Sequence, residues 1–199
     1  MLQAIRRDVI LKNMMDDMKP TEPLLLSRRQ VITGLAGVAA TLILPKPALA
    51  LPWNEVRRLS FDHTHTGESM DVVYWAEGKY VKDGLRRANY LLRDFRNGRE
   101  KTIDPELLDK LVLLQRKLGS NGRFEIISAY RSPQTNRMLR SRSRGVAKQS
   151  FHLQGKAIDV RLTDVDLYTL REAAVEMGGG GVGIYTGADF LHLDTGPER

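Results

Sequence analysis

The spacing of leucines after residue 104 predicts one long helix with a buried face. Leucines at positions 107, 111, 114 and 118 recur every three or four residues, which places them on one side of a helix. Asp104-Pro105 before this stretch is typical of a helix start, because aspartate caps free backbone N–H groups and proline fits the first turn. Gly119 is typical of a helix end.

The segment 157–162 instead has the two-residue alternation of a β-strand. Its apolar residues Ile158, Val160 and Leu162 fall on one side, and the carboxylate of Asp159 falls on the other. We therefore expect Asp159 to point away from the apolar row.

Further strands and helices are predicted over the rest of residues 51–199, without a repeat or a linker. The expected strands cover 59–61, 70–75, 123–129, 182–185 and 190–193, and the first two form a hairpin around the turn 65–68. The expected helices are 84–95 with Asp83 as cap, one that opens at Ser132-Pro133, and one from Thr163 to Met177 that is broken by Gly178–Gly181. These 149 residues suit one domain with its own core.

The first 50 residues predict an export signal. Arg28 and Arg29 precede an uncharged run over 31–44, and Ala48-Leu49-Ala50 is a small-x-small cleavage pattern. The run of fourteen residues is shorter than the roughly 20 apolar residues that a spanning helix needs. We expect a twin-arginine signal peptide over 1–50 that the Tat export machinery recognises and that is removed near Ala50; the alternative is an uncleaved anchor.

The mature chain, residues 51–199, is then expected in the periplasm or another extracytoplasmic space, as a monomer without a stable membrane anchor. Residues 1–50 hold seven of the 31 Lys/Arg and four of the 24 Asp/Glu, which leaves a net charge of +4. A mildly basic exported domain suits an anionic polymer such as cell wall or phospholipid headgroups, although a normally solvated surface explains the same charge. Because the chain has no cysteine, neither a disulfide nor a thiolate metal site is available.

Two histidines and an aspartate form a candidate metal site. His152, Asp159 and His192 supply three ligands, the number that a hydrolytic zinc site uses while it keeps one position open. Six residues including a glycine separate His152 from Asp159, so a tight turn can bring the imidazole over the strand that carries the carboxylate. The alternative is that both histidines are hydrogen-bonded core residues and Asp159 pairs with a cation.

Two further carboxylates are candidates for a general base beside the metal. In an extended strand Phe190, His192 and Asp194 share one face, whereas Asp189 lies in the turn just before the strand. Either Asp189 or Asp194 could reach a water on the metal.

The motif H-x-x-G-x-A-x-D, followed by D-x-x-H-x-D, resembles the zinc D-alanyl-D-alanine peptidase superfamily, which includes VanX-type dipeptidases, phage endolysin endopeptidases and the hedgehog signalling domain. Within it, residues 55–199 are similar to the YcbK/MepK murein endopeptidases. The segments that carry this similarity are Leu59–Phe61, His65–Glu68, Leu92–Asp94, Ile103–Pro105, Ser128–Pro133, Val146–Lys148 and Gly180–Gly183.

The resemblance implies an α+β fold in which a small antiparallel sheet with flanking helices holds one zinc ion per chain. It also implies a zinc-dependent metallopeptidase that hydrolyses peptide bonds of peptidoglycan stem peptides or cross-links. His152, Asp159 and His192 match the ligands of the superfamily.

The resemblance also bears on the catalytic residues. Asp189 matches the base of the VanX and endolysin branches, and Asp194 remains the competing candidate. Arg131 matches an arginine near the scissile carbonyl, where its charge would stabilise an oxyanion or hold a substrate carboxylate. The alternative for Arg131 is a structural ion pair.

A non-catalytic peptidoglycan-binding module that retains the fold and the metal is the competing function. The sequence does not distinguish D,D- from L,D-bonds, or an endopeptidase from a carboxypeptidase. We expect no nucleic-acid partner, because the basic cluster over 137–148 lacks interleaved aromatic residues. His63 and His65 flank a turn and are interpreted as structural or surface residues.

Overall fold

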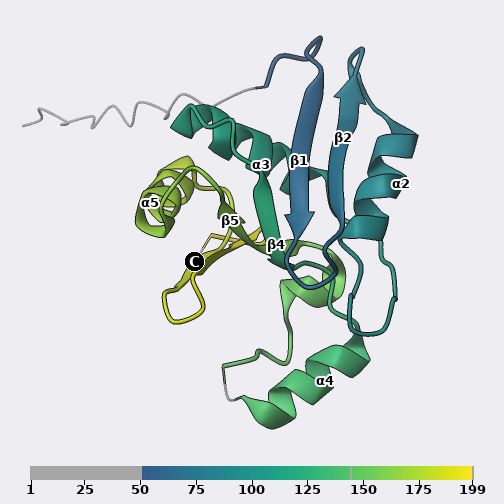
Figure 1. Ribbon diagram of the computed structural model, residues 1–199, viewed down its shortest axis with the longest axis vertical. Coiled ribbons are helices and arrows are strands. Elements are labelled where there is room, and N and C mark those ends of the chain that lie inside the picture. Colours follow the sequence, from purple (N-terminus) through teal and green to yellow (C-terminus); the bar gives the residue numbers. More distant parts are fainter. Residues whose placement is uncertain (1–50, 144, 199) are drawn as a thin grey trace, which may run out of the picture. The chain divides into compact units, whose positions relative to one another are not determined.

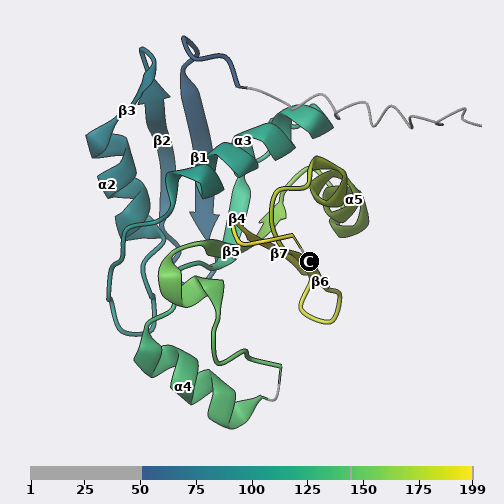
Figure 2. The ribbon, with the colours of Figure 1, turned by 180° about the vertical axis from the view of Figure 1, so that it is seen from behind.

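The structure is a computed structural model that describes residues 51–143 and 145–198, so the predicted signal peptide lies outside the described residues. Within these ranges seven strands form one sheet in the order β3-β2-β1-β4-β5-β7-β6. Four α-helices and one 3-10 helix connect the strands (Figures 1 and 2). None of the helices in the described ranges is long and apolar enough to cross a membrane.

The elements follow one another along the chain, and the longest connection, residues 92–104, joins α2 to α3. The strands are β1 (Arg57–His63), β2 (Ser69–Ala76), β3 (Lys79–Tyr80), β4 (Phe124–Ser128), β5 (Ala157–Leu162), β6 (Val182–Tyr185) and β7 (Phe190–Asp194). The helices are α2 (Lys82–Leu91), α3 (Pro105–Leu118), α4 (Pro133–Arg142), the 3-10 helix η1 (Phe151–Gln154) and α5 (Leu167–Met177).

The α+β class is confirmed, and the sheet is antiparallel except at one pair. β1 and β4 run parallel to each other, whereas every other neighbouring pair is antiparallel. The parallel pair arises because the chain leaves the β1–β2 hairpin through α2 and α3 before it returns as β4, and parallel neighbours need such a crossover.

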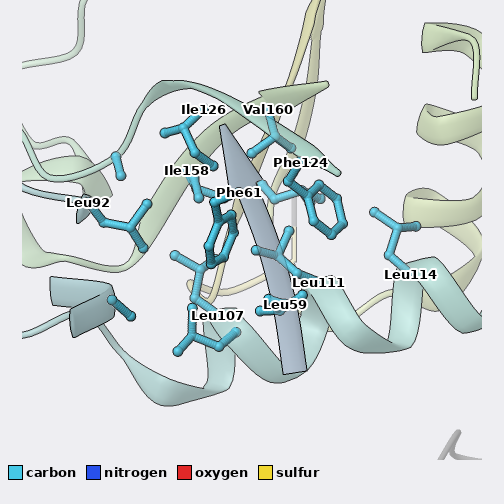
Figure 3. Close-up of a cluster of buried hydrophobic side chains, with 14 of the residues drawn as sticks. Leu59, Phe61, Leu92, Leu107, Leu111, Leu114, Phe124, Ile126, Ile158 and Val160 are labelled. Atoms are coloured by element: carbon cyan, nitrogen blue, oxygen red, sulfur yellow. The ribbon is translucent and has the colours of Figure 1, made fainter. Parts of the chain in front are cut away.

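Helix α3 supplies the centre of the core and has both predicted ends. The Asp104 carboxylate accepts a hydrogen bond from the Glu106 N–H at 3.1 Å, and Gly119 ends the helix in the left-handed conformation at φ 61°. Figure 3 shows the α3 leucines facing the side chains of β1 and β4. The residues in this contact are Leu107, Leu111 and Leu114 of α3 with Leu59, Phe61 and Phe124, all of which are buried.

The bounds of two other helices, α2 and α5, differ from those predicted. Helix α2 begins at Lys82 and ends at Leu91, so Asp83 lies in its first turn and forms an ion pair with Arg86 instead of a cap. Helix α5 begins at Leu167 because the Asp166 carboxylate accepts hydrogen bonds from two N–H groups of its first turn. The predicted start at Thr163 is therefore about one helical turn too early.

The two faces of β5 and β7 have different roles. Ile158 and Val160 of β5, with Leu191 and Leu193 of β7, belong to the hydrophobic core together with residues of α3 and α5. Because side chains alternate along a strand, the residues between them point to the opposite face of the sheet. Asp159 is one of these residues.

Candidate metal centre

The register between β5 and β7 brings two candidate ligands together. Asp159 lies directly opposite His192 in this antiparallel pair. Side chains of directly opposed residues project from the same face of a sheet with their Cβ atoms about 4.5–5.5 Å apart. The strand pairing alone therefore places a carboxylate beside an imidazole on the face away from the core.

The third candidate ligand, His152, comes from the short helix η1. Ser150 caps this helix, and Gly155 ends it in the left-handed conformation at φ 72°. A side chain at position 155 would meet the Thr102 carbonyl oxygen at 2.4 Å, so both the conformation and the space require glycine. This is the tight turn that the spacing between His152 and Asp159 predicted.

Three ligand atoms converge at one point. The Nε2 atom of His152 lies 3.2 Å from Nδ1 of His192 and 3.3 Å from Oδ1 of Asp159. Nδ1 of His192 and Oδ1 of Asp159 are 2.8 Å apart. Ligands at 2.0–2.1 Å from a tetrahedral zinc ion are about 3.3–3.4 Å from one another. The set fits a zinc ion with shifts of a few tenths of an ångström, and it is the one such cluster found in the described part of the chain.

Hydrogen bonds behind the ligands fix which nitrogen of each imidazole faces the centre. Nδ1 of His152 lies 2.7 Å from the Ala129 carbonyl oxygen, and Nε2 of His192 lies 3.2 Å from Oδ2 of Asp194. A carbonyl or carboxylate oxygen only accepts, so each of these nitrogens carries a proton. The opposite ring nitrogens, Nε2 of His152 and Nδ1 of His192, are left to bind a metal.

The ionisation of the site follows from burial and from these contacts. Burial of Asp159 opposes its charge, but the neighbouring His152 and His192 outweigh burial and hold its pKa well below the usual range. Burial would lower the pKa of His192, but hydrogen bonds to Asp159 and Asp194 outweigh it and raise that pKa. In the metal-free protein a proton on His192 therefore lies between it and Asp159, where a metal ion would lie.

Arg131 is brought to the same site. Its Nη2 atom lies 3.6 Å from Oδ2 of Asp159, and its backbone N–H donates to the His152 carbonyl oxygen at 3.1 Å. The Asp94 carboxylate accepts from the next backbone N–H, that of Ser132, at 2.9 Å and so fixes the segment. Burial lowers the pKa of Arg131, partly offset by the carboxylates of Asp159 and Asp94.

An open cleft of about 610 Å³ gives access to the three ligands and to Arg131. It is lined by residues of β6 and by residues of the segment that joins α4 to η1. The first group comprises Val182, Gly183 and Tyr185, and the second includes Val146, Ala147 and Gln149. Within the described ranges, Asp159 is the one carboxylate in the cleft lining.

The two candidate bases lie outside the cleft. Asp189, at φ 52°, has a 68% exposed side chain whose Oδ2 lies 3.4 Å from Nε of Arg161, and its carbonyl oxygen also accepts a hydrogen bond from Arg161. Asp194 is fully buried behind His192, and its Oδ1 accepts from the N–H groups of Gly181 and Gly196. The geometry gives Asp194 the role of orienting His192.

One supporting residue, Lys110, was not predicted from the sequence. Buried Lys110, on α3, donates to the carbonyl oxygens of Gly179 and Asp194 at 2.9 Å each and so ties the end of β7 to the core helix. The sequence feature that could have indicated this role is the position of Lys110 among the α3 leucines. His63 is buried and His65 stacks on Phe95, in agreement with their interpretation as structural or surface residues.

Comparison with known proteins identifies the family of this chain. Residues 52–199 match the model of a peptidase M15 family described as Peptidoglycan L,D-endopeptidase MepK. The chain belongs to this MepK family. The Escherichia coli K12 protein named Peptidoglycan L,D-endopeptidase MepK is 42% identical over 175 residues, which cover 87% of this chain and 96% of that protein.

A second MepK relative and one solved structure are also similar. The Haemophilus influenzae protein named Probable peptidoglycan L,D-endopeptidase MepK is 39% identical over 168 residues, 83% of this chain and 90% of that protein. The crystal structure of Serratia marcescens L-Ala D-Glu endopeptidase ChiX aligns with 24% identity and a TM-score of 0.33, over 46% of this chain and 79% of that one. The structural similarity is too low to bear on fold or function.

The stabilisation of this MepK family member by zinc should increase with pH. The pKa of His192 is raised in the folded protein, so the contacts of its protonated ring stabilise the metal-free protein. This stabilisation is fully present below the pKa of the unfolded state, about 6.5, and is lost as the pH rises through the pKa of the folded state. Zinc competes for the same Nδ1 atom. The rise in Tm on zinc addition should be larger at pH 8 than at pH 5.5.

Thermal unfolding with and without zinc at the two pH values measures this difference. His192→Ala is the control and should show little zinc-induced rise at either pH. A rise in Tm that is equal at pH 5.5 and pH 8 would contradict the competition between the proton and the metal at His192.

Proposed function

We propose that this chain is an exported, zinc-dependent endopeptidase that hydrolyses L,D peptide bonds in peptidoglycan. The peptidase class follows from the family. The L,D bond and the peptidoglycan substrate are inferred from the names of the relatives. Export to the periplasm through the Tat machinery is proposed from Arg28, Arg29 and the uncharged run that follows them.

One observation carries the zinc-dependent part of the proposal. Three ligand atoms of His152, Asp159 and His192 lie 2.8–3.3 Å from one another at an open cleft, with the guanidinium of Arg131 beside them. The other ring nitrogens of the two histidines are held by the Ala129 carbonyl and by Asp194, so these three ligand atoms are left facing one another, and one metal ion would satisfy all three lone pairs at once.

A zinc ion held by these residues would polarise the scissile carbonyl and lower the pKa of a coordinated water to about 7. His152 and His192 would supply neutral imidazole nitrogens to it, because their other ring protons are held by the Ala129 carbonyl and by Asp194. Asp159 would remain ionised at all pH values where the enzyme works, since its pKa is well below the usual range.

Arg131 is proposed to stabilise the negative charge that develops on the carbonyl oxygen during the reaction. Its side chain is only 12% exposed, and its Nε atom is buried without a hydrogen-bond partner among the described residues. A cation that is already in place and poorly hydrated stabilises such a charge without the cost of reorganising water.

Replacement of Arg131 tests this assignment. Arg131→Ala should keep the zinc content and the fold but lower turnover by about 10²-fold, the effect of removing one oxyanion donor. Arg131→Lys should recover part of the loss, because lysine keeps the charge but not the planar fork. The assay is digestion of purified cross-linked muropeptides by the zinc-loaded mature protein, with products identified by mass spectrometry.

Two outcomes of the same assay would contradict the proposal. If the native protein cuts no cross-linked or linear muropeptide with zinc supplied but still binds peptidoglycan, the non-catalytic binding module is the correct function. If Arg131→Ala turns over as fast as the native protein, Arg131 does not act on the reacting carbonyl.

Asp189 remains the proposed general base, although its carboxylate must leave Arg161 and enter the cleft to act. Asp189→Asn should retain zinc and lower turnover by about 10²-fold or more. Asp194→Asn should weaken zinc binding by about 10–100-fold, because Asp194 orients His192, and excess zinc should restore its activity. Zinc titration and turnover are measured for both variants.

The two variants separate the roles of the two carboxylates. Native turnover in Asp189→Asn would remove Asp189 from the mechanism and leave it as the partner of Arg161. If Asp194→Asn binds zinc normally but is inactive even at saturating zinc, then Asp194 is the base.

A further inference from the structure

The strand β6 forms one edge of the sheet, beside the metal centre. It pairs only with β7 in the strand order, and none of its four residues is buried. An edge strand presents backbone N–H and C=O groups that no neighbouring strand uses. Three of the four β6 residues, Val182, Gly183 and Tyr185, also line the cleft that holds the ligands.

The register of β6 and β7 shows which backbone groups are unused. The Asp194 N–H donates to the Gly181 carbonyl oxygen at 3.0 Å, so these two residues form a hydrogen-bonded pair. Such pairs recur at every second residue of an antiparallel ladder. Gly183 and Tyr185 are therefore bonded to β7, whereas the N–H and C=O groups of Val182 and Ile184 point outward and have no hydrogen-bond partner among the described residues.

Gly183 joins this free edge to the metal ligands. It lies directly opposite His192, so Asp159, His192 and Gly183 form one row across β5, β7 and β6. A Cβ atom at position 183 would lie 3.5 Å from Cβ of His192 and 3.4 Å from the ring of Tyr185. The absence of a side chain at this point leaves the path from the edge of β6 to the ligands open.

We propose that the peptide substrate binds as an added strand along β6, with its backbone hydrogen-bonded to Val182 and Ile184. This proposal rests on the endopeptidase function proposed above and adds the mode of substrate binding. Strand addition to a sheet edge supplies affinity through main-chain hydrogen bonds and does not depend on particular side chains. It would place the substrate backbone beside Gly183, with β6 between it and the strand β7 that carries His192, at the cleft that Arg131 also lines.

Substitution of Ile184 by proline removes one outward N–H. Proline is tolerated on an edge strand when its nitrogen faces away from the ladder, and the preceding residue is glycine, so the β6–β7 pairing should remain. Ile184→Pro should raise KM for a soluble cross-linked muropeptide by about 3- to 10-fold, the net value of one hydrogen bond, with kcat and zinc content little changed. Ile184→Val keeps the N–H, and its own effect on KM measures the contribution of the side chain.

Substrates with a modified backbone give a second, independent measurement on the native enzyme. Muropeptide analogues in which single amides near the scissile bond are replaced by esters lose one hydrogen-bond donor each and have a weaker acceptor carbonyl. At one position the ester should raise KM for the native enzyme. The same ester should raise KM less in Ile184→Pro, because the N–H group of residue 184 that would bond to its carbonyl is already absent.

The outcomes distinguish this inference from the proposed function. If the native enzyme cleaves the muropeptide but Ile184→Pro has the KM of Ile184→Val, and every ester acts equally in both proteins, strand addition at β6 is wrong and the endopeptidase function stands. If the native zinc-loaded protein does not cleave the muropeptide at all, the proposed function fails and this inference fails with it.

Discussion

The pairing of β5 with β7 sets the geometry of the whole site. It places Asp159 opposite His192 on the face away from the core, while Ile158 and Leu193 anchor the same two strands in the core. If β7 were shifted by one residue against β5, His192 would turn into the core and Leu193 would turn outward, so the two ligands would no longer share a face. The hydrophobic contacts that stabilise the fold therefore also hold the metal ligands in place.

The ligands differ in how they are held. His192 is oriented by Asp194 from its own strand, and the end of that strand is tied to α3 by Lys110. His152 is oriented by the Ala129 carbonyl. Two residues further along that segment, the backbone N–H of Arg131 bonds to the His152 carbonyl, and the backbone N–H of Ser132 bonds to the Asp94 carboxylate. As a result, the backbone of Arg131 and the third ligand, His152, belong to one hydrogen-bonded unit, which a change of the Arg131 side chain would leave intact.

Much of this arrangement could be predicted from local patterns in the sequence. Alternation predicted the bounds of β5 and the direction of Asp159, and capping residues predicted both ends of α3. The convergence of His152, Asp159 and His192 followed from a glycine turn and strand pairing. Local patterns could not predict the parallel pairing of β1 with β4, because it depends on a crossover between segments about 60 residues apart.

The carboxylates beside the site show a second limit of the sequence. Asp189 lies three residues before His192 and Asp194 lies two residues after it, but the positive φ of Asp189 turns it toward Arg161 and strand alternation carries Asp194 under His192. The orienting Ala129 carbonyl and the free edge of β6 are backbone groups, so no residue type marks them. These features depend on tertiary structure, which fixes what each backbone and carboxylate group faces.

The hydrogen bonds behind the ligands select a different ring nitrogen of each histidine for the metal. Nitrogen-15 NMR of the zinc-loaded mature protein tests it directly, because metal-bound and protonated imidazole nitrogens have distinct shifts. We predict ring protons on Nδ1 of His152 and Nε2 of His192, with zinc on Nε2 of His152 and Nδ1 of His192. Zinc on the same type of nitrogen in both residues, or no effect of zinc on either ring, would contradict this selection.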